Sequence, residues 1–134
     1  MRNLFSLAII FCCLTFTSCK SQENITINYE ARTRGYHYKL SLNKNLLDII
    51  KNSDKKNIEL SKNQIDTIAN ILTDINFSEI QNNTSTDNFA NDSSIPINMS
   101  ILFKEKEYIF NFDSANIPLK INELMLKLTE FSKE

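Results

Sequence analysis

The chain has 134 residues, with 15 Lys and Arg against 16 Asp and Glu, and it contains three cysteines but only one glycine and one histidine. This length fits one domain with a modest core. The near-neutral charge argues against nucleic acid as a partner, and a single histidine makes a histidine-rich metal site or a Ser-His-Asp triad hard to build. No metal, cofactor or catalytic residue is predicted.

The first 18 residues have the layout of a secretory signal peptide. A basic start that contains Arg2 precedes an apolar run from Leu4 to Phe16, and the small residues Thr17 and Ser18 follow. This run is shorter than the roughly 20 residues that a helix needs to cross a bilayer, so a permanent transmembrane helix is the weaker interpretation.

The segment Phe16-Thr17-Ser18-Cys19 resembles the lipobox of bacterial lipoproteins, although an aliphatic residue is usual where Phe16 stands. The resemblance implies cleavage before Cys19, lipidation of the Cys19 sulfur and a further acyl chain on its amine. We therefore expect a signal peptide over 1–18, a tether over 19–24 and one domain over 25–134. The alternative is ordinary secretion, which leaves Cys19 as a free thiol.

Strict alternation of apolar and polar residues begins at Ile25 and continues on both sides of Gly35. A turn on Arg34-Gly35 predicts a hairpin in which Glu30 lies opposite Lys39. The same register pairs apolar residues: Ile27 with Leu42, Tyr29 with Leu40, and Ala31 with Tyr38.

A short apolar run over Leu46–Ile50 predicts a third strand, and the polar residues 52–56 predict a turn after it. Ser61 and Gln64 have the spacing of a capping box, which predicts that a helix begins there. Its apolar stripe consists of Ile65, Ile68, Ala69, Leu72 and Ile75.

Residues 81–94 carry almost no apolar surface and predict a mobile loop. Two alternating runs follow and predict a second hairpin that turns on Glu105-Lys106. The expected pairs are Lys104 with Glu107, Phe103 with Tyr108, and Ile101 with Phe110.

Pro118 suits the first turn of a last helix. The apolar face of that helix consists of Ile121, Leu124, Met125, Leu128 and Phe131. The elements together predict an α+β protein with a single antiparallel sheet of four to five strands and two helices packed on one face, in the order β-β-β-α-β-β-α.

The lipobox and residues 29–35, Tyr-Glu-Ala-Arg-Thr-Arg-Gly, resemble small lipoproteins of the Bacteroidota with a Tyr-x-Ala-x-Thr-Arg-Gly first hairpin. The resemblance extends loosely over the rest of the chain, where the second turn lacks a glycine. It implies a fold and a place in the cell envelope, but it carries no activity with it. We expect the outer membrane, on the side that faces the periplasm.

A candidate binding surface surrounds the first turn and consists of Arg32, Arg34, His37 and Lys39. Basic side chains in this pattern can present an anion-binding surface, but they also serve simply to keep a strand soluble. His37 falls opposite Arg32 on the polar face, where an ordinary exposed histidine is the simpler interpretation. Tyr36 and Tyr38 are assigned to the core face by the alternation.

The leading hypothesis is a non-catalytic, lipid-anchored domain that contributes a binding or interaction surface. Its expected contacts are the membrane, through Cys19, and a possible protein partner of unknown identity. One alternative is a small hydrolase, for which paired acids have to come from Glu30, Glu59, Glu79 or Asp113. Another is an inhibitor or immunity-type protein that uses loop 81–94. Asp87 and Asp92 in that loop supply oxygens for a cation, but without the spacing of a calcium loop.

Overall fold

The computed structural model describes residues 24–82 and 94–134, which form one antiparallel sheet of six strands and two α-helices. The sheet order is β4-β3-β2-β1-β5-β6. The elements in chain order are β1 (Thr26–Thr33), β2 (Tyr36–Asn43), β3 (Leu46–Lys51), β4 (Asp54–Glu59), α2 (Lys62–Thr73), the 3-10 helix η2 (Phe77–Glu79), β5 (Pro96–Phe103), β6 (Lys106–Asp113) and α3 (Leu119–Phe131).

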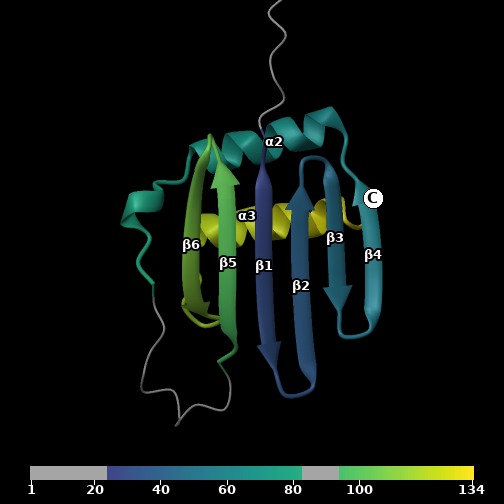
Figure 1. Cartoon of the computed structure of the whole chain (residues 1–134), viewed down its shortest axis with the longest axis vertical. Helices are drawn as coiled ribbons and strands as arrows, with labels where there is room; N and C mark the ends of the chain where they lie inside the picture. Colours follow the sequence, from purple (N-terminus) through teal and green to yellow (C-terminus); the bar gives the residue numbers. More distant parts are fainter. Residues whose placement is uncertain (1–23, 83–93) are drawn as a thin grey trace, which may run out of the picture.

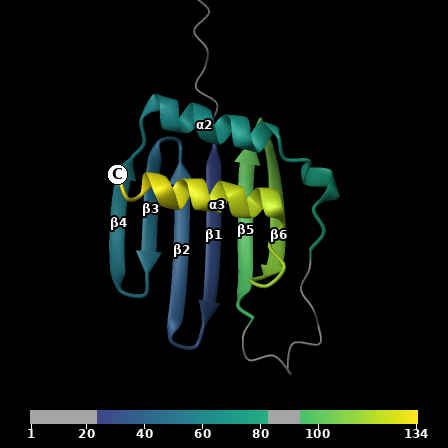
Figure 2. The ribbon, with the colours of Figure 1, turned by 180° about the vertical axis from the view of Figure 1, so that it is seen from behind.

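The helices cover one side of the sheet. α3 crosses the strands near the middle of one face, and α2 runs beside it along the end of the sheet where β1 begins (Figures 1 and 2). No other described element covers the opposite face, which we call the open face.

The first hairpin has the predicted register. Glu30 lies opposite Lys39, and the three predicted apolar pairs and Arg32 opposite His37 are all confirmed. Gly35 has a φ of +76°, a left-handed conformation that glycine adopts without steric cost. The same register pairs apolar residues with one another on the core face and opposite charges on the polar face.

The prediction of four to five strands is wrong because residues 52–56 are not one long turn. The turn consists of Asn52 and Ser53 only, with Asn52 at a φ of +55°, and β4 follows directly and pairs with β3 along its whole length. β4 is an edge strand whose one apolar residue is the partly buried Ile58. Backbone pairing holds a strand of this kind, so it carries no alternating apolar pattern.

The second hairpin forms, but its predicted register is wrong by two residues. The turn is Lys104-Glu105, both at positive φ, so that Phe103 lies opposite Lys106 and Ile101 opposite Tyr108. A shift of two residues leaves every side chain on the same face of the strand. The apolar pattern therefore cannot distinguish the two registers, and the geometry of the turn selects one.

Both helices begin close to the residues at which the sequence predicts their N-termini. The Ser61 side chain accepts a hydrogen bond from the Gln64 backbone while the Gln64 side chain accepts one from the Ser61 backbone, which is the predicted capping box. Pro118 precedes the first residue of α3, and all five predicted apolar residues of that helix are buried.

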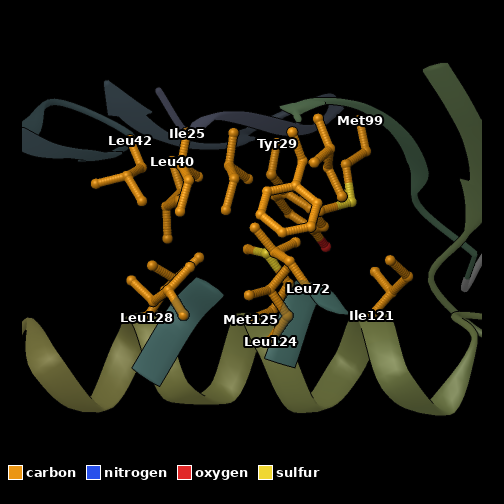
Figure 3. Packing of buried hydrophobic residues seen from close by; sticks show 14 of the residues in the cluster. Ile25, Tyr29, Leu40, Leu42, Leu72, Met99, Ile121, Leu124, Met125 and Leu128 are labelled. Carbon is orange, nitrogen blue, oxygen red and sulfur yellow. The ribbon is translucent and has the colours of Figure 1, made fainter. Parts of the chain in front are cut away.

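The core lies between the sheet and the helices (Figure 3). Its buried residues all fall between Ile25 and Phe131, so the chain after Cys19 contains the whole described core. Phe77 in η2, which the sequence reasoning missed, stacks on Tyr108 of β6 with ring centroids 4.1 Å apart. Burial of apolar surface on one face of the sheet leaves the open face largely polar, with Leu46 and Ile109 as exposed apolar residues on it.

Candidate functional site

Three of the four residues predicted as a binding surface lie together on the open face. Arg32 is opposite His37, one pair before the end of the β1–β2 ladder, and Lys39 is two residues farther along β2 on the same face. Arg34 is exposed in the turn itself. We call these four residues the basic surface, and they occupy the half of the first hairpin that contains the turn. Figure 1 shows that turn at the lower end of β1 and β2.

His37 has a partner that the sequence reasoning missed. Its Nε2 lies 2.9 Å from Oε1 of Glu30, and because a carboxylate can only accept, the ring nitrogen donates. The side chains of His37 and Glu30 are 33% and 41% exposed, so the pair is accessible from solvent. The prediction of an ordinary exposed histidine opposite Arg32 is correct in position, but it omits this contact.

Glu30 lies among the residues of the basic surface. It is directly opposite Lys39 in the register, is bonded to His37, and shares its strand face with Arg32 two residues away. The only sequence signal for this arrangement is the register itself, since diagonal neighbours across an antiparallel pair lie within reach of long side chains.

Tyr36 and Tyr38 are partly buried and pack against the core, as their alternation predicts. The rings of Tyr38 and Tyr29 meet edge to face. Burial, together with the neighbouring Tyr36 and Tyr38, raises the pKa of Tyr29 to about 12. The two faces of the hairpin therefore differ sharply: one is aromatic and packed, and the other is charged and accessible.

A row of short polar side chains crosses the centre of the open face. The Ser41 hydroxyl donates to Oδ1 of Asn28 at 2.8 Å, and Nδ2 of Asn28 donates to Oγ of Ser100 at 3.3 Å. Asp48, opposite Ser41 on β3, has a buried Oδ1 with no hydrogen-bond partner within the described residues. Sequence reasoning did not find this row, because it depends on the pairing of β1 with both β2 and β5.

The acids considered for hydrolysis do not form a pair with Glu30. Glu59 lies on β4, three strands away, and Glu79 lies in η2. Asp113 is buried at the end of β6, two strands from β1. In the described ranges, no group of three or more His, Cys, Asp or Glu is placed to hold a metal ion.

Several predicted features lie outside the described residues. They are Cys19 with the whole signal peptide, and the part of loop 81–94 that holds Asp87 and Asp92. Within residues 24–82 and 94–134, no helix is long and apolar enough to span a membrane.

No protein-family model, curated protein or solved structure matches the chain.

Proposed function

We propose that this protein is a lipid-anchored component of a bacterial envelope, similar to the small lipoproteins of the Bacteroidota, whose domain binds a partner without catalysing a reaction. The basic surface is its binding surface. The observation that carries the proposal is that this surface surrounds the turn at one end of the sheet, whereas β1 begins at the opposite end.

The distances support this arrangement. Six residue steps separate Cys19 from Ile25, a reach of about 20 Å when fully extended. β1 then runs for eight residues away from that point, which is about 26 Å at the rise of a strand. Anchoring at Cys19 keeps the beginning of β1 near the bilayer and presents the first turn to the periplasm.

The proposed anchor at Cys19 has enough acyl chains to hold the protein stably in a membrane. Each buried methylene contributes about 0.8 kcal/mol, so a single acyl chain binds only marginally, whereas two or three chains hold a protein stably. The mature chain has no second cysteine with which Cys19 might form a disulfide, since Cys12 and Cys13 lie in the signal peptide. We place the anchored protein in the outer membrane, on the periplasmic side.

Anchoring is tested by replacing Cys19→Ala in the full chain. We expect this variant to keep its signal peptide and to lose labelling by radioactive palmitate. Cys13→Ala is the matched control, because it removes a cysteine from the apolar run and should leave labelling intact. Palmitate on the Cys19→Ala variant contradicts the proposal, and fractionation of labelled wild type on a density gradient tests the outer-membrane location.

Binding is tested by photo-crosslinking in the cell. A photo-reactive amino acid at position 34 should give an adduct with a protein partner, whereas one at position 104, in a turn at the opposite end of the sheet, should not. Equal adducts at both positions, or none at position 34, contradict the assignment of the basic surface.

A further inference from the structure

The carboxylate of Glu30 lies within the basic surface as a built-in counter-ion. It accepts a hydrogen bond from His37 at 2.9 Å, and its direct cross-strand neighbour is Lys39. A charge-assisted bond of this kind is stronger than a neutral one, and its partial exposure leaves both groups open to exchange with another anion. The surface thus already holds one carboxylate.

We propose that the basic surface binds an extended, acidic segment of a partner protein, and that Glu30 occupies the position that one of the partner's carboxylates takes on binding. This inference rests on the proposed function, because it names the chemistry that the binding surface recognises. Binding exchanges one carboxylate for another at His37, next to Lys39, so Glu30 weakens the affinity for acidic ligands.

The spacing of the cations favours a peptide. On the open face, each cross-strand pair of β1 and β2 forms one level. Lys39 and Glu30 form one level, Arg32 and His37 form the next, and Arg34 lies beyond them in the turn. Successive levels on one face of a strand are about 6.6 Å apart, which is also the spacing of alternate side chains in an extended peptide. A segment with acidic residues at every second position, lying along β1 and β2, presents one carboxylate to each level.

The location of the surface favours a protein segment over a lipid headgroup. The same cations can attract anionic lipid, but in the proposed anchoring the six residue steps from Cys19 to Ile25 keep the other end of β1 near the bilayer. An acidic segment in the periplasm meets the basic surface directly. Vesicles therefore serve as a competing probe in the experiment.

The experiment uses residues 20–134, which contain the whole described core. The probe is a fluorescein-labelled ten-residue peptide of alternating Glu and Thr, and fluorescence anisotropy reports its binding. We expect Glu30→Gln to tighten binding by about fivefold, and Arg34→Gln and Lys39→Gln each to weaken it by about fivefold, the scale of one accessible ion pair. Glu107→Gln is the matched control, because it removes an exposed carboxylate on β6 and should leave affinity unchanged.

A second readout reports whether a peptide carboxylate replaces that of Glu30 at His37. The chain has one histidine, so the imidazole carbon resonances of untagged protein report on His37 alone. We expect saturating acidic peptide to shift these resonances in the wild type and in Glu107→Gln. Their invariance in a protein that binds the peptide overturns the proposed exchange at His37.

The outcomes separate this inference from the proposed function. If Arg34→Gln weakens peptide binding while Glu30→Gln leaves it unchanged, Glu30 does not occupy a carboxylate position, but the basic surface remains the binding surface. If neither Arg34→Gln nor Lys39→Gln affects binding, both proposals are lost. Binding to vesicles with 30% anionic phospholipid, without binding to the peptide, overturns the choice of a protein segment.

Discussion

The rings of Tyr29 and Tyr38 meet edge to face across β1 and β2, with centroids 6.0 Å apart and ring planes at 75°. Tyr38 lies directly opposite Ala31, so the contact is diagonal. On the other face of the hairpin, His37 lies opposite Arg32 but bonds to Glu30 along the same diagonal. Both contacts therefore follow from one register together with the twist of the two strands.

Because Tyr29 is packed in the core, the stability of the protein should fall with rising pH in the alkaline range. Its pKa is raised to about 12, so the folded state favours the protonated phenol. Between pH 10 and 12 the unfolded chain loses this proton while the folded chain keeps it, and stability falls as pH rises through that window. Urea unfolding at a series of pH values should show this fall, and Tyr29→Phe should flatten it. An unchanged pH dependence in that variant contradicts the assignment.

Substitution of Gly35 should lower the stability of the protein because of the backbone conformation at this position, and not because of a steric clash. No atom lies within 4 Å of the position that a Cβ would take there, but the φ of +76° is strained for any residue with a side chain. We expect Gly35→Ala to lower the free energy of unfolding by about 1 kcal/mol. Chemical denaturation measures this loss, and Ser53→Ala, in a turn position without a positive φ, should cost less.

The second hairpin offers a test of its register. Lys104 and Glu105 both have positive φ, so Glu105→Gly relieves strain and, combined with Lys104→Asn, creates the Asn-Gly turn that suits this geometry. We expect the double variant to gain about 1 kcal/mol of stability. Lys106→Gly, at the first position of β6, should lose stability instead. The opposite order in thermal melts would favour a turn on Glu105-Lys106.

Two leucines of α3 should respond very differently to truncation. Leu124 is fully buried against the sheet, whereas the side of the helix that carries Leu126 faces solvent, with that residue 63% exposed. We expect Leu124→Ala to cost about 2–5 kcal/mol and Leu126→Ala to stay within about 0.5 kcal/mol of wild type. Equal losses in the two variants would show that the outer side of α3 is also covered in solution.

Local sequence patterns predicted much of this fold because they report which face of an element is apolar. The first hairpin was predicted pair by pair, since the charges of Glu30 and Lys39 and the apolar alternation agree on one register. The capping box at Ser61 similarly predicted the start of α2. The shared face of Arg32, His37 and Lys39 was predicted for the same reason. Their role as a binding surface stays a prediction.

Features that depend on backbone pairing or turn geometry, and not on an apolar pattern, were not predicted. β4 pairs through its backbone and has almost no apolar side chain, so it was assigned to a turn. The second hairpin has two registers with identical faces, and only the conformation of Lys104 and Glu105 distinguishes them. The polar row through Asn28 exists only because β5 pairs with the second edge of β1.

The sequence by itself therefore determined which side chains face the core and which face solvent, because a period of two or 3.6 residues is a local property of the chain. It also contains the lipobox-like segment that ends at Cys19, outside the described residues, where lipidation stays a prediction. The tertiary structure decided the order of the strands and the place of Glu30 beside His37. These depend on which strand edges meet and on the twist that brings diagonal neighbours together, and no local period encodes either.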